Sequence, residues 1–321
     1  MKKILCAAAL AALVVPTSAN AINLYDKDGF KYDFGGSWKI KFMQEVGEDQ
    51  DLDLVFGDLE LRNGAEYDLG NNMTAFGRVD FGLKKAANDS NDNDRAHLEE
   101  AYLGISVSST SILFGKTDGA ADNFGVADAE ENPVADDVFD EYGAVDGDDL
   151  IKIETKIGDM ITLVADHEIA ADSSNSNGNG KFFSLYAQAD VAGFTFGAAF
   201  QNFDPAAEVD EAGIVKELDD YNLFGVSLAY DAGFVSVGAD YSIKEDTDST
   251  PERAITNIVV GAPIGEYINI VGGYVILDSD TASEEMNGWY VNFNYHLPMQ
   301  ENVGFFAEIE DNDADNSDMG F

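Results

Sequence analysis

The segment between Asp118 and Asp149 contains the residues with the most evident chemistry. It carries twelve carboxylates and neither lysine nor arginine. Carboxylates at this density attract cations and repel anions, which is a chemistry of ion accumulation and not of bond cleavage. The acidic residues at its centre, which we take as candidates for contact with ions, are Asp128, Glu130, Glu131, Asp136, Asp137, Asp140 and Glu141.

Apolar side chains interrupt this acidic segment. Phe124, Val126, Val138, Phe139 and Tyr142 lie among the carboxylates, and a fully solvated acidic linker would have no use for them. The segment is also longer than an ordinary connection between strands or helices. We interpret it as a loop with one apolar edge packed on a wall and one charged edge facing water.

Patterns typical of catalysis or cofactor binding are missing from the sequence. His97, His167 and His296 are far apart and lack metal-ligand spacing. The chain has no Gly-x-Ser-x-Gly elbow, no phosphate-binding loop and no dinucleotide fingerprint. We therefore expect no enzyme activity, no cofactor and no metal site. A barrel esterase or phospholipase whose serine lies outside any motif is the enzymatic alternative.

The N-terminus has the pattern of a secretory signal peptide. Lys2 and Lys3 precede an apolar run of about a dozen residues, which is too short to span a bilayer. The small residues that end at Ala21 predict cleavage after that residue. We therefore expect residues 1–21 to be a signal peptide and residues 22–321 to form the mature domain. The only cysteine, Cys6, lies within the signal.

The composition excludes several classes of protein. The chain has 61 acidic and 18 basic residues, with a formal net charge of −43, so nucleic acid is not an expected partner. Its 45% hydrophobic content argues against disorder. After the signal, no run of 18 apolar residues occurs, which excludes a helical membrane protein. A β-barrel remains possible, because only every second residue of its strands faces lipid.

Hydrophobic residues alternate with polar ones along most of the chain. Ile151 and Ile153 fall on one face of a strand, for example, and Lys152 and Glu154 on the other. The pattern predicts fifteen strands, at 33–46, 53–67, 73–84, 97–107, 111–117, 151–157, 160–169, 181–191, 194–203, 220–231, 234–244, 254–263, 267–277, 289–297 and 303–310.

The connections between these strands alternate in length. Short turns are expected at 69–72, 108–110, 158–159, 192–193, 232–233, 264–266 and 298–302. Longer polar loops fall between them, at 47–52, 85–96, 118–149, 170–180, 204–219, 245–253 and 278–288. An antiparallel up-and-down barrel separates its turns and loops to opposite ends in this way, whereas a Greek-key sandwich does not.

The polar faces of the strands indicate water inside the barrel. With the apolar positions directed outward, charged residues such as Glu60, Arg62, Arg78, Asp80 and Lys152 point inward. Burial of so many charges in a dry core would cost several kcal/mol for each unpaired ion. The aromatic residues that end the apolar faces suit the interfacial girdles of a membrane barrel. A soluble sandwich with an acidic exterior is the alternative.

Two motifs resemble the general diffusion porins of Gram-negative outer membranes. Residues 25–31, Tyr-Asp-Lys-Asp-Gly-Phe-Lys, resemble the start of the mature family members, and Gly115-Lys116 before the acidic segment resembles their fifth strand and loop 3. The resemblance implies an all-β, transmembrane, antiparallel up-and-down barrel of the 16-stranded type, with loop 3 (118–149) folded into the lumen. It also implies a homotrimer.

The same resemblance assigns roles to charged residues. In the family, loop 3 narrows each pore opposite a basic cluster on the wall. The acidic side would be the seven carboxylates named first. The basic wall would be Lys39, Lys41, Arg62, Arg78, Lys116 and Lys152. The loop departs from the family in lacking a Pro-Glu-Phe-Gly-Gly turn, which leaves open the choice of carboxylates at the constriction.

The C-terminal end also departs from the family pattern. Residues 311–319 are acidic and unpatterned, whereas the last strand of the family is amphipathic. We expect about fifteen full strands and a truncated sixteenth, which begins at Gly320-Phe321. A genuine short last strand is the alternative.

We expect a channel for passive diffusion of ions and small hydrophilic solutes, with a weak preference for cations. The expected partners are outer-membrane lipid, lipopolysaccharide and the solutes themselves. A sugar-specific channel that uses the inward residues Tyr102, Tyr186 and Tyr290 is one alternative. An acidic surface β protein or adhesin that forms no channel is the other.

Overall fold

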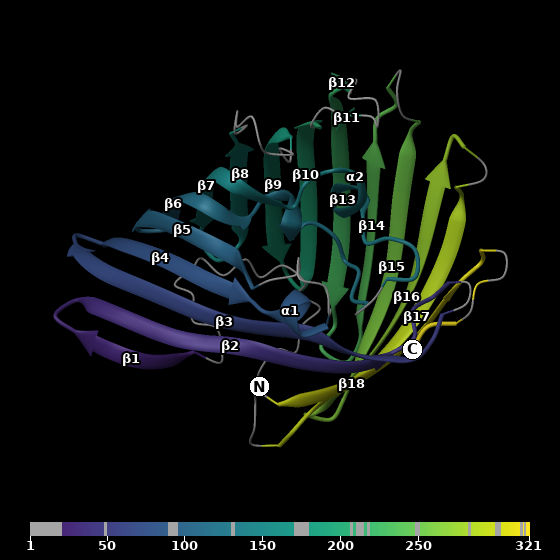
Figure 1. Cartoon of the computed structure of the whole chain (residues 1–321), viewed down its shortest axis with the longest axis horizontal. Helices are drawn as coiled ribbons and strands as arrows, with labels where there is room; N and C mark the ends of the chain where they lie inside the picture. The colour runs from purple at the N-terminus through teal and green to yellow at the C-terminus, as the bar shows by residue number, and fades with distance from the viewer. Residues whose placement is uncertain are drawn as a thin grey trace.

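The computed structural model describes residues 21–47, 50–88, 96–129, 132–169, 180–205, 208–209, 215–216, 219–247, 251–281, 284–298, 303–314, 317 and 319–321. Within these residues, sixteen strands form one antiparallel sheet that curves around a hollow (Figure 1). The strands of this sheet are β1 (Ile22–Lys27), β2 (Phe30–Met43), β3 (Asp53–Gly70), β4 (Met73–Gly82), β5 (His97–Val107), β6 (Thr110–Asp118), β7 (Asp146–Ile157), β8 (Ile161–Glu168), β9 (Lys181–Val191), β10 (Phe194–Asp204), β13 (Tyr221–Asp231), β14 (Ser236–Lys244), β15 (Arg253–Ile264), β16 (Ile268–Ser279), β17 (Met286–His296) and β18 (Gly304–Asn312).

The sheet confirms the predicted up-and-down topology, since each strand pairs with the next one in the sheet along the chain. The short turns and long loops alternate as predicted. The loop after β10 contains a small hairpin of β11 (Glu208–Val209) and β12 (Val215–Lys216) that the alternation did not predict. The helix α1 (Lys84–Asn88), in the loop after β4, was also not predicted. None of the described helices combines the length and the apolar character that a membrane crossing requires.

The strand count differs from the fifteen expected, because the sheet also includes β1. This strand pairs with β2 through a two-residue turn at Asp28 and Gly29. Both turn residues have positive φ, at 55° and 83°, and such a turn matches the twist of an antiparallel pair. The Asp-Gly pair within the motif at 25–31 thus makes a hairpin, and this hairpin supplies the sixteenth strand.

The last two residues lie between β18 and β2. Gly320 forms a bridge with Glu310 of β18. Phe321 exchanges two backbone hydrogen bonds with Gln44, at 2.9 and 3.0 Å. Gly320 and Phe321 therefore pair with both neighbouring strands, although they form an isolated bridge and not one of the sixteen strands. The predicted signal peptide and its cleavage site after Ala21 cannot be compared in the same way, because residues 1–20 lie outside the described residues.

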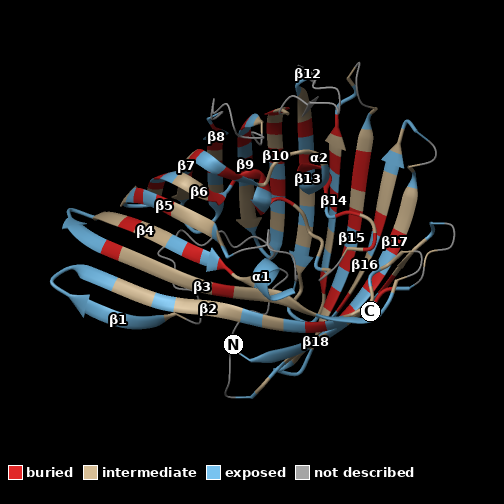
Figure 2. Ribbon diagram, viewed as in Figure 1, coloured by how far each residue is buried: buried red, intermediate tan, exposed pale blue. Residues whose placement is uncertain are grey.

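The two faces of the sheet differ in chemistry. On the outer face large apolar side chains are exposed, with 78% exposure for Trp38 and 72% for Leu103. On the inner face, charged and polar residues such as Glu60, Asp80 and Asp240 are buried. Figure 2 shows buried positions alternating with less buried ones along the strands. The residues that the two-residue period predicted to face inward or outward do so in the structure.

Loop 3 lies inside the curve of the sheet, as predicted. It runs over residues 119–145, because β7 already begins at Asp146. It contains a 3-10 turn, η1 (Ala121–Asn123), and a short helix, α2 (Val138–Tyr142). The turn η1 contacts β9 and β10, and α2 contacts β14 and β15 (Figure 1). The loop thus follows the inner face across half of the sheet before it returns to β7.

Candidate functional site

A cluster of ionisable side chains covers the inner face of β3, β4 and β5. We call it the charged wall; its members are Glu60, Arg62, Arg78, Asp80 and Glu100. The Arg62 Nη2 lies 2.5 Å from the Glu60 Oε2, and the Arg78 Nε lies 2.7 Å from the Glu100 Oε2. Arg78 also forms an ion pair with Asp80, whose side chain is fully buried.

Strand register brings the members of the charged wall together. Asp80 on β4 lies opposite Arg62 on β3 and opposite Glu100 on β5. Arg78 is two residues from Asp80, so it shares the same face. Three carboxylates therefore surround two guanidinium groups, and the charged wall carries a net negative charge when its carboxylates are ionised. The resemblance implied a basic wall, and the structure instead has arginines that are neutralised by acidic neighbours.

Three of the predicted lysines lie elsewhere on the inner face. Lys152 on β7 donates from Nζ to the Asp118 carbonyl over 2.9 Å at the beginning of loop 3. On β2, Lys41 is 7% exposed, and the Lys39 Nζ lies 5.7 Å from the ring centre of Phe306. These side chains are spread over several strands, so no compact basic cluster forms from the predicted set.

The family resemblance predicted that Lys116 belongs to the basic wall, and the structure contradicts this prediction. It is paired in register with Ala101, which belongs to the outward set of β5 together with Leu103. The register between β6 and β7 shifts between Gly115 and Thr117. Its ammonium group pairs with Asp148 at the beginning of β7. Lys116 has the same parity as the outward residues Ile112 and Phe114. It therefore lies away from the charged wall, although the family resemblance placed it there.

The predicted carboxylates of loop 3 fall into three groups. The first group is exposed on the loop surface and comprises Asp128, Asp136, Asp140 and Glu141. Asp137 is 2% exposed and caps α2, since its Oδ1 accepts a 2.7 Å hydrogen bond from the Phe139 amide. The prediction that Asp137 faces the passage is therefore wrong. Glu130 and Glu131 lie outside the described residues.

The proton affinity of the loop carboxylates is raised. The surrounding protein limits their solvation and raises the pKa of Asp122 to about 7, with a further contribution from the negative charge of Asp118. The same cause, together with Asp136 and Glu141, raises the pKa of Asp140 to about 6. Burial holds the pKa of Asp137 well above its usual range. The charge of loop 3 therefore depends on pH near neutrality.

Side chains of the wall bind the backbone of loop 3. The Val126 amide donates to the Asp240 Oδ2 over 2.7 Å, and the Asp128 amide donates to the Tyr290 hydroxyl over 2.8 Å. In the opposite sense, the Asn257 Nδ2 donates to the Asp136 carbonyl over 2.6 Å. Additional bonds join Val138 to Ser242, Pro133 to Asn312 and Ala144 to Gln201. Because the loop has little secondary structure, the wall satisfies its backbone groups.

An apolar core lies between loop 3 and the wall. Val138 and Phe139 of the loop are fully buried, and they belong to one cluster with Leu223, Ile255 and Val275 of the strands. The sequence predicted a loop with one apolar edge packed on a wall. The structure shows that edge packed on the inner face of the strands.

A basic and aromatic cluster at the loop ends of β13, β14 and β15 was missed by the sequence reading. The Lys244 Nζ lies 4.5 Å from the ring centre of Tyr221, and the Arg253 guanidinium lies 5.3 Å from that of Tyr142. The Tyr221 hydroxyl donates to the Tyr142 carbonyl. The inward parity of Lys244 and Arg253 was readable from the strand pattern, but their contact with loop 3 was not.

The three tyrosines proposed for a sugar channel are on the inner face but are covered. Tyr102 is 6% exposed, Tyr186 5% and Tyr290 1%. Tyr290 accepts its hydrogen bond from loop 3, and the Tyr186 hydroxyl donates to Gln188 over 2.8 Å. Their rings therefore do not form an open aromatic surface along the passage.

Across the described ranges, no group of three or more His, Cys, Asp or Glu side chains is arranged to hold a metal ion. The ring of His167 interacts instead with the Phe182 carbonyl, at 2.9 Å. The charged side chains of the inner face are arranged to attract hydrated ions and not to coordinate a bound metal ion.

Comparison with known proteins gives consistent matches over nearly the whole chain. A family model described as Gram-negative porin matches residues 7–317. Porin-like protein H of Photobacterium profundum is 26% identical over 340 residues, which cover 100% of this chain and 98% of that protein.

Two solved structures share the fold. The OmpF structure of Salmonella typhi, in complex with daunomycin, has a TM-score of 0.69 at 15% identity and covers 93% of this chain and 97% of its own. The trimer form of OmpT of Vibrio cholerae has a TM-score of 0.64 at 17% identity, with 89% of each chain covered.

Proposed function

The chain belongs to the Gram-negative porin family, and on that premise we propose that it forms a water-filled channel that passes cations in preference to anions. Porins of this fold are channels of the outer membrane and not enzymes. The preference for cations is our proposal, and it rests on the charges of the inner face.

The charged wall supports this proposal most directly. Both arginines, Arg62 and Arg78, are engaged by carboxylates, so neither presents an uncompensated positive charge to a passing anion. The wall also adjoins the acidic beginning of loop 3, because Asp118 interacts electrostatically with Arg78 and Lys152. The exposed carboxylates of the loop add negative charge to the passage.

The mechanism follows from the interaction of these charges with mobile ions. At 4 Å in water, one unit charge attracts a counter-ion by about 1 kcal/mol, and this corresponds to about a fivefold change in local concentration. Several carboxylates act together here, so cations are enriched and anions depleted near the wall. Salt weakens the effect, because the Debye length falls from about 10 Å at 0.1 M to about 3 Å at 1 M.

Single-channel reversal potentials in a potassium chloride gradient test the preference. We expect the sign of a cation-selective channel at 0.1 M salt and a smaller potential at 1 M. A preference for chloride would refute the proposal even if the protein conducts.

We propose passive diffusion of small hydrophilic solutes as the transport mode, because the three inward tyrosines do not form an open sugar-binding surface. Liposome swelling with sugars of rising size tests this. The swelling rate should fall smoothly with solute size, and a saturable response to one sugar would instead support a specific channel.

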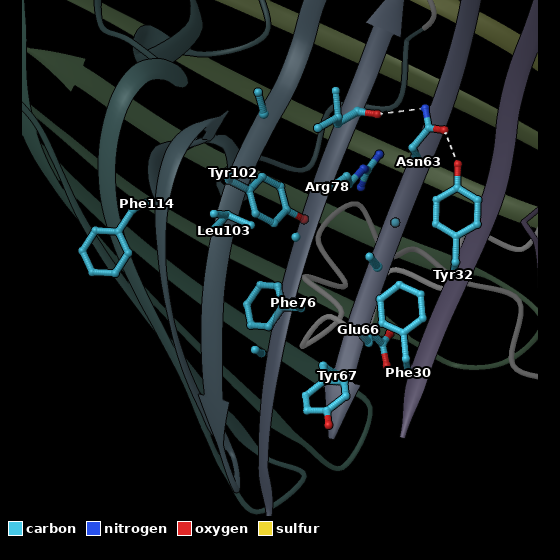
Figure 3. Close-up of a pocket in the computed structure, with 16 residues that line it drawn as sticks. Phe30, Tyr32, Asn63, Glu66, Tyr67, Phe76, Arg78, Tyr102, Leu103 and Phe114 are labelled. Carbon is cyan, nitrogen blue, oxygen red and sulfur yellow. Dashed lines mark hydrogen bonds between the residues drawn. The ribbon is translucent and has the colours of Figure 1, made fainter. Parts of the chain in front are cut away.

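The outer face of β2 to β6 supports a homotrimer. It contains a depression of about 880 Å³ with the small residues Ala65, Ala75, Gly77 and Ala101 in its lining. Figure 3 shows Asn63 at this depression, where its Oδ1 accepts a 2.8 Å hydrogen bond from the Tyr32 hydroxyl. A polar side chain and a hollow surface suit contact with a second copy of the chain better than contact with lipid.

The proposed trimer interface can be tested by substituting a small residue with tryptophan. A tryptophan side chain is accommodated on a surface that faces lipid but would disrupt a packed protein interface. Ala65→Trp should convert trimers to monomers on unheated detergent gels. The control is Ala187→Trp, in a separate depression of the outer face between β7 and β10, which should leave the trimer intact. Equal behaviour of both variants would argue against this interface.

Two further proposals concern maturation and the outer leaflet. We propose cleavage after Ala21, which N-terminal sequencing of the exported protein tests. We also propose that divalent cations bridge the acidic outer loops to lipopolysaccharide phosphates. Unchanged thermal stability in lipopolysaccharide after chelation would count against that bridge.

A further inference from the structure

Three glycines of the inner wall lie directly under side chains of loop 3. They are Gly225 on β13, Gly238 on β14 and Gly288 on β17. A Cβ atom at Gly225 would come within 2.5 Å of the Phe124 ring and 2.8 Å of the Phe139 ring. These distances are well inside ordinary van der Waals contact. A side chain at Gly225 therefore cannot coexist with loop 3 in its present position.

The other two wall glycines show the same arrangement. A Cβ at Gly288 would lie 2.5 Å from Val134 and 2.9 Å from the ring of Pro133, and one at Gly238 would lie 3.2 Å from the Val126 Cβ. Glycine is disfavoured within strands because it loses more entropy and packs no side chain. Its presence at these inward positions fits a close approach by another part of the chain.

Loop 3 contributes glycines to the same contact. A Cβ at Gly119 would come within 2.7 Å of the Asp166 Oδ2, and one at Gly143 would come within 2.3 Å of the Gln201 Oε1. Asp166 and Gln201 are side chains of the wall, on β8 and β10. The fit is thus reciprocal: side chains of the loop enter gaps in the wall, and side chains of the wall enter gaps in the loop.

The side chains above these glycines have little room to move. Phe124 and Phe139 contact each other edge to face, with ring centres 5.1 Å apart, and both are buried at 8% and 0% exposure. The ring of Pro133 is rigid, and the Pro133 carbonyl is held by the Asn312 Nδ2 at 2.8 Å. Added volume at Gly225 or Gly288 must therefore displace the loop and not merely rotate one side chain.

We propose that Gly225, Gly238 and Gly288 are sockets that set the distance of loop 3 from the wall and thereby the bore of the channel. The effect on the bore rests on the proposed channel function, whereas the seating of the loop does not. Filling a socket pushes the loop away from β13–β17 and into the lumen. The passage becomes narrower, so conductance and the size limit for solutes both fall.

The principal test is a graded series at Gly225 and Gly288, with Ala and then Val at each position. We expect single-channel conductance to fall in the order wild type, Ala, Val. The matched control is Gly272→Ala on β16, where the nearest atom to an added Cβ is the Tyr290 carbonyl oxygen at 3.7 Å. This control should conduct as the wild type does. Wild-type conductance in both Gly225→Ala and Gly288→Ala would overturn the proposal.

A compensating variant separates displacement of the loop from damage to the strand. Phe124→Ala removes the ring that occupies the Gly225 socket, so Gly225→Val combined with Phe124→Ala should conduct more than Gly225→Val alone. Strictly additive losses from the two changes would contradict the socket, because residues in direct contact are expected to be coupled.

The seating of the loop can also be measured without any channel. The wild type, Gly225→Val, Phe124→Ala and the double variant form a double-mutant cycle. They can be compared by cleavage of loop 3 with a protease specific for acidic residues, after refolding has been verified by heat-modifiable migration. Gly225→Val should speed cleavage, and the double variant should slow it again. If the wild type does not conduct but this cycle shows coupling, the channel proposal fails and the socket stands. If it conducts but the cycle shows no coupling, the socket fails alone.

Discussion

The inner faces of β3–β5 and of β13–β17 obey the same two-residue period but serve different purposes. On β3–β5 the inward positions hold Glu60, Arg62, Asp80 and their ionic partners. On β13–β17 the inward positions under loop 3 are mostly glycine, serine, asparagine and aliphatic residues, and the buried Asp240 accepts a hydrogen bond from the loop. One region satisfies its polar groups laterally, strand to strand, and the other satisfies them by binding a separate segment of the chain.

This difference shows how a barrel can be wet and packed at once. Charges on the charged wall are compensated by neighbours two residues away or one strand away, so the region does not need a cover. The loop-covered region lacks enough charge to remain solvated and carries apolar residues such as Ile255 and Val275, which are removed from water by Phe139 and its neighbours.

The largest effect should come from removing a cation from the charged wall. Arg78→Met leaves Asp80 and Glu100 without their main partner, and removal of one member of a buried ion pair costs about 3 kcal/mol or more. Urea unfolding followed by tryptophan fluorescence measures the loss. Lys27→Met is the control, because its ammonium lies 3.8 Å from the Asp28 carboxylate and both side chains are exposed, and such pairs contribute below about 1 kcal/mol. Equal losses in both variants would remove the distinction between buried and exposed pairs.

The second largest effect on stability should come from the side-chain amide of Asn257, in the loop-covered region. Asn257→Ala deprives the Asp136 carbonyl and the Asp240 carboxylate of a donor, and an unsatisfied buried polar group costs about 1–3 kcal/mol. We expect a lower unfolding midpoint together with noisier conductance as loop 3 loosens. Asn294→Ala removes an amide that donates to the Asn292 side chain of the same strand and should change neither quantity appreciably. Noise that rises equally in both would mean that Asn257 has no special part in holding the loop.

Charge neutralisation on the charged wall should change selectivity more than stability. Glu60→Gln combined with Glu100→Gln leaves Asp80 as the one carboxylate beside Arg62 and Arg78 among the five members of the wall. The cation preference should fall by about fivefold for each of the two charges removed, the value of one unit charge at 4 Å in water. Reversal potentials at 0.1 M potassium chloride measure it. An unchanged ratio would place the selective region on loop 3 alone.

The smallest effect should be the response of loop 3 to pH. The pKa of Asp122 is raised to about 7 and that of Asp140 to about 6 by limited solvation and neighbouring negative charge. Both carboxyls take up protons as pH falls from 8 to 5, so the cation preference should decrease over that range. The raised pKa also means that the folded protein binds these protons more tightly than the unfolded chain, so stability should rise as pH falls through this window. Asp122→Asn with Asp140→Asn should flatten the selectivity profile; a profile of unchanged shape would assign the titration to other groups.

The sequence by itself determined the local features of this protein. Period-two alternation fixes which residues of each strand face inward, since neighbouring side chains of an extended chain point to opposite sides. The alternation of short turns with long loops fixes the up-and-down order. An acidic loop with an apolar edge was readable because Val138 and Phe139 stand among carboxylates that could not share a core.

Only the tertiary structure decided which of these residues meet. The ion pair between Lys116 and Asp148 forms where the register between β6 and β7 shifts by one residue, and no local pattern encodes that shift. The capping of α2 by Asp137 depends on where the loop turns. The contacts of Gly225 and Gly288 with loop 3 join residues about a hundred or more positions apart. Alternation is a property of one strand, whereas register, capping and packing are properties of segments brought together, and the free energy that selects them is shared between those segments.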